Sequence, residues 1–454
     1  MRARCPILLA PILAGGLLAS CASAPSSVEN SASEQMHRVG GILRADGANP
    51  ALPELSPDSP PAEFVHYALL NHPAVVAAYY DWRADVEVIT AARALPDPQF
   101  TLQADIAGTL MSFMPGLMFD FMAQGKRAAM GREAAATSGV SYRTYVAAVL
   151  RTAADVRKAW IELAYVDEMA RLREGSLSAL DQGLALANIE YATGRGMSTL
   201  ETQVRLTNEI AKVRNEISTL SDRRTAARVR FKSALGLAPS DIDPPWPTAL
   251  LTVTPLPPED ELWRRAQAAN PELGRMRAMV DMAMAGMEVA RSSRTPDFAL
   301  GAMVDLKANP LMARPTASVT LPIWRAKIAA TIAAAGARRD AAAARLSAEQ
   351  INLAAELAQM LYIVREADRM IIYLDGTALP NLDRSIATVE AAYQSGMTGA
   401  AMIPETRLMA LRMRQERAAA LRDRETAATD LLLLTADVAP EAPPLLAEQV
   451  ISAR

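Results

Sequence analysis

Residues that could carry out chemistry are few in this sequence, and their spacing does not bring them together. The histidines are His37, His66 and His72, and no two of them have the spacing of a metal-binding pair on a helix. The segment Gln-Gly-Lys-Arg at 124–127 lacks the serine or threonine that follows the lysine of a phosphate-binding loop. We therefore expect no enzyme activity, no cofactor and no resident metal ion.

Methionine is the one residue type whose abundance could indicate a ligand. The chain has 22 methionines, and a group of them surrounds one expected hairpin: Met111, Met114, Met118, Met122 and Met130. Thioether sulfur binds soft cations such as Cu(I) and Ag(I). Methionine also fills gaps in packed cores, and the sequence alone favours that structural role.

The charge of the chain argues against one class of partner. The formal net charge is −3 at pH 7. Without a surplus of basic residues there is little to bind a phosphate backbone, so we expect no nucleic-acid partner.

The first residues have the pattern of an export signal. Arg2 and Arg4 precede an apolar stretch over 6–18, which ends in Leu-Ala-Ser-Cys at 18–21. This ending resembles the bacterial lipobox. We therefore expect residues 1–20 to be a signal peptide, Cys21 to be acylated (the palmitate site), and 21–60 to form a lipid-anchored linker. An ordinary signal peptide with an incidental cysteine is the alternative.

The rest of the sequence contains an internal duplication with an offset of about 200 residues. Asn-His-Pro at 71–73 is echoed by Asn-Pro at 270–271, Leu-Pro-Asp at 95–97 by Thr-Pro-Asp at 295–297, and Tyr-Ala-Thr-Gly at 191–194 by Tyr-Gln-Ser-Gly at 393–396. We expect two copies of one unit, at 61–238 and 261–439. A proline-rich linker at 239–260 joins them, and a tail follows at 440–454.

Each copy is expected to contain two short strands followed by two long helices. Apolar and polar residues alternate over about 98–108, 115–124, 297–306 and 315–323, which is the period of a strand. Heptad spacing predicts helices over about 126–193, 198–236, 325–395 and 401–436. Gly175 and Gly183 are candidate interruptions of the first. The predicted fold class is mainly α with a small membrane β part, built from a duplicated helix–strand–strand–helix–helix unit.

The strands have the length of tilted transmembrane β-strands. Their polar face carries Gln103, Asp105, Asp120 and Asp305. Four strands cannot close a barrel, and an open edge is not tolerated in hydrocarbon, so several copies must share one barrel. Two copies would give about 8 strands, with side chains filling the interior. Three would give about 12 strands and room for a water-filled lumen lined by these four residues.

The order of these features resembles the outer membrane efflux protein family typified by TolC, over about 61–439. The resemblance implies a homotrimer with a barrel of about 12 strands in the outer membrane, continued by an α-helical coiled-coil barrel into the periplasm. It also implies a passive exit duct for small molecules or metal ions. A periplasmic adaptor and an inner-membrane pump, of the resistance-nodulation-division type, would deliver this cargo.

The same resemblance assigns individual sites. The turns that contain Tyr191 with Gly194, and Tyr393 with Gly396, correspond to the periplasmic tip where adaptors dock. Met402 and Glu405 stand where some members carry two aspartates that constrict the pore. The segment 117–132 also resembles the heavy-metal branch of the family, which includes copper–silver and cobalt–zinc–cadmium exporters.

Two other classes of protein remain open from the sequence. One is a lipid-anchored periplasmic coiled-coil scaffold or adaptor, which would have no use for strands with a fully apolar face. The other is a lipid-anchored enzyme with a helical domain, for which the sequence shows no site.

Overall fold

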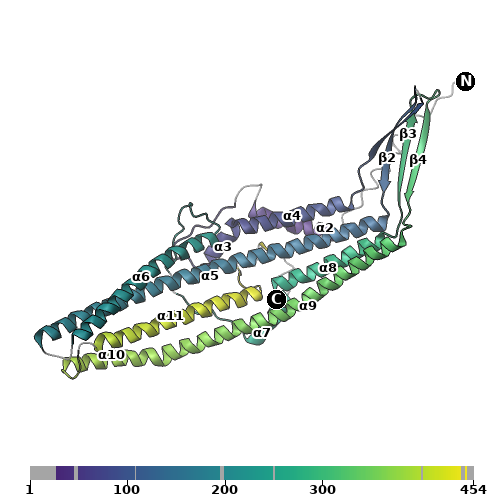
Figure 1. Ribbon diagram of the computed structural model, residues 1–454. Helices are drawn as coiled ribbons and strands as arrows, with labels where there is room; N and C mark the ends of the chain where they lie inside the picture. The colour runs from purple at the N-terminus through teal and green to yellow at the C-terminus, as the bar shows by residue number, and fades with distance from the viewer. Residues whose placement is uncertain are drawn as a thin grey trace. The chain divides into compact units, whose positions relative to one another are not determined.

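The computed structural model describes residues 27–44, 50–107, 109–194, 199–248, 251–399, 402–440 and 445–446. The helices are α2 (Ser27–Leu43), α3 (Pro61–Asn71), α4 (Pro73–Arg93), α5 (Gln124–Thr193), α6 (Leu200–Ala234), α7 (Glu259–Ala269), α8 (Pro271–Ser292), α9 (Arg325–Tyr373), α10 (Leu379–Gln394) and α11 (Met402–Leu434). The strands are β1 (Gln99–Ala107), β2 (Thr109–Phe121), β3 (Asp297–Asp305) and β4 (Met312–Thr320). A mainly helical chain with a small sheet was expected and is confirmed (Figure 1).

The chain divides into two compact units, and each unit combines both halves of the sequence. The first unit comprises residues 1–41, 77–145 and 272–349, and the second comprises 42–76, 146–271 and 350–454. The two predicted sequence copies therefore do not form separate compact bodies, because each copy contributes to both units. Within the described residues, no helix has both the length and the apolar character needed to cross a membrane.

The first unit contains a single antiparallel sheet with the strand order β1-β2-β3-β4. The ends of α4, α5, α8 and α9 meet one end of this sheet (Figure 1). β2 begins at Thr109, earlier than the predicted start near 115, because its first residues pair back onto the end of β1 across a tight hairpin. β4 begins at Met312, before the predicted 315, and includes Pro315. Proline is tolerated there because β4 is an edge strand, whose outer N–H groups need no partner within the sheet.

An aromatic cluster holds α4 against the first part of α5. The ring of Trp82 stacks on that of Tyr145 with a centroid separation of 5.6 Å, and lies 5.0 Å from the ring of Tyr142. Tyr79 packs edge-on against Trp82, and its hydroxyl donates a hydrogen bond to the carbonyl oxygen of Met36 in α2. Because β1 follows α4 and β2 precedes α5, this cluster fixes where the first hairpin starts and returns.

In the second unit, the glycines of α5 are packing positions and not interruptions. α5 is one continuous helix from Gln124 to Thr193. A Cβ atom on Gly183 would lie 2.5 Å from Cγ of Pro404 in α11, so the missing side chain lets the two helices approach closely. Gly175 has more room, since its Cβ would lie 3.5 Å from Leu411. Neither glycine interrupts the helix, so that candidate role was wrong.

The helix predicted over 325–395 is divided by a π-helical turn at Leu374–Ala378. Pro380 follows this turn, and a proline inside a regular α-helix would clash with the carbonyl of the preceding turn. The wider π-helical turn accommodates it. Arg417 of α11 donates two hydrogen bonds to the Asp375 carboxylate, of 2.6 and 3.0 Å, and thereby holds the turn against α11.

The duplication is visible in the second unit as a repeated helix end. The side-chain amide of Asn71 donates to the carbonyl of the residue that caps α6, at 3.0 Å. The side-chain amide of Asn270 donates to the last carbonyl of α11, at 3.2 Å. A left-handed residue follows each helix, Gly236 with φ +78° and Ala436 with φ +60°. The echo at 71–73 and 270–271 therefore marks the same structural role in both copies.

Candidate functional site

The cross-strand register of the sheet shows which side chains share a face, because directly paired residues point to the same side. Phe100 pairs with Leu117, and Leu117 pairs in turn with Ala302. Every paired residue on this face is apolar: Phe100, Leu102, Ala104, Phe113, Pro115, Leu117, Phe119, Phe121, Phe298, Leu300, Ala302, Val304, Ala313, Pro315, Ala317 and Val319. We call it the apolar face.

The opposite side, the polar face, carries a mixture of carboxylates, amides, hydroxyls and methionines. Its paired residues are Gln99, Thr101, Gln103, Asp105, Ser112, Met114, Gly116, Met118, Asp120, Asp297, Ala299, Gly301, Met303, Asp305, Met312, Arg314, Thr316, Ser318 and Thr320. The alternation read from the sequence thus holds across all four strands at once.

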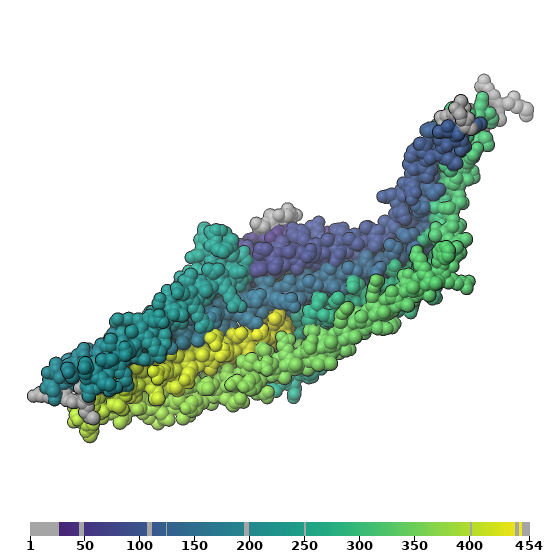
Figure 2. Space-filling view, in the orientation of Figure 1, coloured from purple at the N-terminus to yellow at the C-terminus, as the bar shows by residue number. Residues whose placement is uncertain are grey.

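The apolar face is exposed, unlike the apolar face of a sheet in a water-soluble protein. Phe100 is 69% exposed and Val319 is 59% exposed on the apolar face, whereas Asp305 on the polar face is only 5% exposed. In Figure 2 the strands β1 and β2 (blue) and β3 and β4 (green) lie side by side, with no helix over the side in view. An apolar sheet face of this extent requires an apolar surrounding or a covering partner.

The four residues predicted to line a lumen lie together on the polar face. Gln99 donates to the carboxylate of Asp120 at 2.7 Å, and Ser112 donates to that of Asp105 at 2.7 Å. The carboxylate of Asp305 accepts from the backbone N–H of Lys307 at 3.0 Å and lies 3.9 Å from the guanidinium of Arg314. Gln103 shares the face through its pairing with Met114. That these side chains line a pore stays a prediction.

The end of the sheet nearest the helices contains an ion pair that the sequence did not reveal. The side chain of Lys126, in the first turn of α5, forms a hydrogen-bonded ion pair with Asp297 at the start of β3. The same carboxylate accepts from the backbone N–H of Ala123 at 3.2 Å. Asp297 stands in a repeated motif, but only the fold brings the lysine of one copy to the aspartate of the other.

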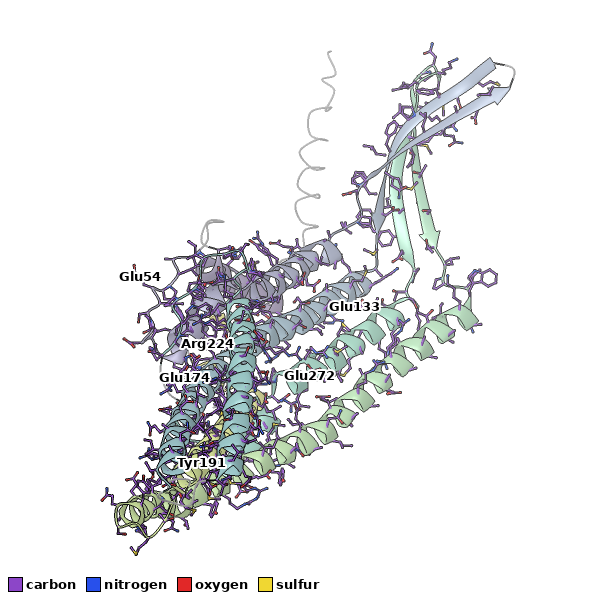
Figure 3. All side chains as sticks on the ribbon, turned by 60° about the vertical axis from the view of Figure 1, so that its left-hand side comes forward. Glu54, Glu133, Glu174, Tyr191, Arg224 and Glu272 are labelled. Atoms are coloured by element: carbon purple, nitrogen blue, oxygen red, sulfur yellow. The ribbon has the colours of Figure 1, made fainter. Side chains whose placement is uncertain are left out.

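The two predicted tip turns are left-handed caps of the helices that precede them. Gly194 has φ +61° and Gly396 has φ +71°, conformations that favour glycine. After α10, the N–H of Met397 donates to the carbonyl of Ala392 at 2.9 Å, which closes a Schellman-type cap. Tyr191 lies near the end of α5 and is exposed (Figure 3).

Residues 195–198 and 400–401 lie outside the described residues, so only part of each connection is seen. Tyr393 belongs to the last turn of α10 and stands where Tyr191 stands in α5. The docking role of these turns stays a prediction.

The candidate constriction has a feature that the sequence could not show. Met402 is exposed at the start of α11, but Glu405 accepts a hydrogen bond of 2.6 Å from Arg205 of α6. Two residues along, Arg407 donates to Gln182 at 2.9 Å and to the carboxylate of Glu390 at 2.6 Å. The carboxylate of the candidate constriction is therefore paired with a cation from the other copy.

A buried ion pair holds the proline-rich linker in place. Arg424 and Glu425 of α11 have side chains that are only 6% exposed. Glu425 accepts from the backbone N–H of Thr254 at 3.1 Å, and Arg424 donates to the carbonyl of Thr254 at 2.8 Å and to Asp368 at 2.8 Å. A buried charge that is satisfied on both sides fixes geometry more than it adds stability.

The shifted pKa values of two groups near or in the helices have structural causes. Burial lowers the pKa of His72, an effect partly offset by its hydrogen bond to the carbonyl of Ser233 and by Asp155. Burial also raises the pKa of Tyr145 within the aromatic cluster. Across the described ranges, no three His, Cys, Asp or Glu side chains are grouped so that they could hold a metal ion. Cys21, the predicted acylation site, lies outside the described residues.

Comparison with known proteins gives one family match and several similar structures. Residues 262–437 match the family model described as Outer membrane efflux protein. No protein with a curated function matches the sequence.

Among solved structures, the chain is similar to CusC, with a TM-score of 0.70, 16% identity, and coverage of 83% of this chain and 92% of CusC. It is also similar to the outer membrane protein VceC of Vibrio cholerae, with a TM-score of 0.68, 16% identity, and coverage of 84% and 96%. The MtrE outer membrane channel of Neisseria gonorrhoeae gives a TM-score of 0.67, 18% identity, and coverage of 84% and 89%. The chain thus has the fold of these outer membrane proteins, and its second half carries the sequence pattern of the outer membrane efflux protein family.

Proposed function

We propose that this protein is the outer-membrane channel of a tripartite efflux system. The observation that carries the proposal is the pair of sheet faces, one wholly apolar and mostly exposed and the other polar. Lipid satisfies the first face and water the second, which is the arrangement of a transmembrane strand in a water-filled barrel. The family match at 262–437 supports the same conclusion.

The sheet edges favour assembly into a homotrimer. β1 and β4 are the two edges of the sheet and each is nine residues long, so β4 of one copy can pair with β1 of the next at every position except the missing N–H of Pro315. Two copies would give about 8 strands, a barrel whose interior is filled by side chains. Three copies give about 12 strands and leave room for a lumen lined by Gln103, Asp105, Asp120 and Asp305.

The lipid anchor fits the position of the first described helix. Residues 22–26 separate Cys21 from Ser27, and an extended segment of this length spans at most about 20 Å. At the start of α2, Glu29 pairs with Arg93 at 2.9 Å, close to the end of α4 that leads into β1. Acyl chains on Cys21 would therefore enter the leaflet near the foot of the strands, which supports an outer-membrane location.

The turns at Gly194 and Gly396 would form the periplasmic tip, where an adaptor docks and a pump of the resistance-nodulation-division type delivers cargo. Met402 and Glu405 would lie at this constriction. Because Glu405 is paired with Arg205, opening that depends on charge would act through this ion pair. The cargo would be small molecules or metal ions, and the likeness of 117–132 to the heavy-metal branch supports the second class.

The decisive experiment is single-channel recording from the purified protein in planar bilayers. We expect stable conductance steps from a detergent-resistant, heat-modifiable trimer in the outer-membrane fraction. A lipid-anchored scaffold would be found in the same fraction but would give no conductance and no heat-modifiable species. That result would contradict the proposed channel function.

A further inference from the structure

We propose that Met114, Met118 and Met303 form a thioether site for a soft monovalent cation, Ag(I) or Cu(I), on the polar face of the sheet. The location of this site inside a lumen rests on the proposed function. The site itself rests on the strand register. Two methionines of the group around the first hairpin belong to this site. The third comes from the other sequence copy.

The register brings the three sulfur-bearing side chains around one position, Gly116. Met114 and Met118 lie two residues before and after Gly116 on β2, so all three share the polar face. Met303 of β3 is the direct partner of Gly116. It is therefore diagonal to both methionines of β2, a relation that long side chains can bridge.

Gly116 supplies the space for this arrangement. A Cβ atom built on it would lie 2.3 Å from Cγ of Met303, which shows that the methionine side chain crosses directly over the glycine. Any other residue at 116 would displace Met303 from the position between its two neighbours. Gly116 therefore leaves room for the Met303 side chain, a role that the sequence pattern of the strand did not explain.

The surroundings suit a soft cation better than a hard one. Met114 is only 1% exposed, and Met118 and Met303 are half-buried, so the sulfur atoms lie in a partly dehydrated place on an otherwise polar face. Thioethers prefer Cu(I) and Ag(I) over oxygen-seeking cations such as Mg²⁺ or Ca²⁺. Met312 of β4 pairs with Asp305 and is diagonal to Met303 on the same face.

The charge of the polar face favours a cation as well. Asp105, Asp120 and Asp305 lie on the same face, and Arg314 is the basic residue among its paired positions. The guanidinium of Arg314 lies 3.9 Å from the carboxylate of Asp305, which offsets its positive charge. A univalent cation bound to neutral sulfur therefore lies in a region of net negative charge.

The competing explanation is that these methionines only fill space. Replacement by leucine distinguishes this packing role from metal binding. Leucine has nearly the volume of methionine and is tolerated in cores at less than about 1.5 kcal/mol, but it has no sulfur. We compare the wild type with the triple variant Met114→Leu, Met118→Leu and Met303→Leu. A matched control carries Met284→Leu, Met370→Leu and Met409→Leu, which replaces three exposed methionines of α8, α9 and α11.

The probe is Ag(I) in chloride-free buffer, and bound metal is counted by mass spectrometry after desalting of the purified oligomer. The wild type and the control are expected to hold about one more Ag(I) per protomer than the sheet variant. X-ray absorption of the bound silver should show sulfur neighbours. In bilayers, Ag(I) should reduce the conductance of the wild type reversibly and leave that of the sheet variant unchanged.

Equal silver binding by the wild type and the sheet variant would overturn the proposal, as would oxygen or nitrogen neighbours alone. If the wild type shows normal conductance but binds no silver, the thioether site is contradicted. The proposed channel function is then unaffected. Absence of conductance in every variant, together with sulfur-ligated silver in the wild type, would contradict the proposed channel function. It would still support the thioether site.

Discussion

Two adjacent residues of β4 offer a sharp test of which sheet face contacts lipid. Ala317 lies on the apolar face and pairs with Leu300, whereas Ser318 lies on the polar face and pairs with Ala299. Both side chains are small and exposed in the single chain. In a water-soluble sheet, Ala317→Arg and Ser318→Arg would therefore have similar, small effects.

In a membrane the two variants differ strongly. An arginine on the lipid face of a barrel costs about 2–4 kcal/mol at the middle of the bilayer and about 0–1 kcal/mol near its surfaces. Leu300, the partner of Ala317, is the second of four apolar positions on β3, between the edge and the middle of the apolar band. We therefore expect a cost of about 2 kcal/mol per copy for Ala317→Arg, or about 6 kcal/mol for a cylinder of three identical copies.

The assay is the yield of heat-modifiable trimer in the outer-membrane fraction, followed by denaturant unfolding of the trimer in lipid vesicles. Ala317→Arg should lower the yield and the unfolding midpoint, whereas Ser318→Arg should assemble normally and change only conductance or ion selectivity. Ser318→Ala and Ala317→Ser serve as controls for the loss of each side chain. Equal behaviour of the two arginine variants, or a larger defect in Ser318→Arg, would refute the assignment of the faces.

Three further predictions concern the helices and can be measured as shifts in the denaturant midpoint. Gly236→Ala should destabilise the protein by at least about 2 kcal/mol, because the residue is left-handed and its Cβ would lie 2.7 Å from the Cα of His72 in the same copy. Ala436→Gly should instead be neutral or stabilising by up to about 1 kcal/mol. Similar losses in both variants would contradict this. Gly183→Ala should cost about 1–3 kcal/mol through its clash with the proline of α11, whereas Gly175→Ala, with ordinary contact distances, should gain helix stability. The pKa of His72 is lowered by burial, so its neutral form stabilises the fold at pH values above the unfolded pKa of about 6.5, and this contribution is lost as the pH falls. His72→Gln should therefore lose less stability than the wild type between pH 7.5 and pH 5, and an unchanged pH dependence would show that another group is responsible.

The sequence was sufficient to place the strands and most helices because their signals are local and periodic. Alternation of apolar and polar residues identified β1 and β3 closely, since each strand pairs along its full length and presents two different environments. The start of β2 was placed near 115 and not at Thr109, because residues 109–114 join the strand through their pairing with β1. That pairing is a tertiary contact and has no local signal in the sequence.

Helix interruptions were predicted less well, because they depend on what packs against the helix. Gly183 has the low helix propensity of any glycine, yet α5 continues through it, since the residue is needed for close contact with Pro404. Conversely, the π-helical turn before Pro380 had no signal in the heptad pattern. That turn is stabilised by an ion pair between Asp375 and Arg417, which lie in different helices.

For the candidate sites, the residue types, their alternation and the duplication can be read from the chain directly, because these are properties of short segments and of their repetition. The tertiary structure alone decided which residues from the two copies meet: Lys126 with Asp297, Arg205 with Glu405, and Met303 with Gly116. These contacts join residues far apart in the chain. Strand register and helix packing set them, and both are fixed only when the two copies fold against each other and bury their shared surface.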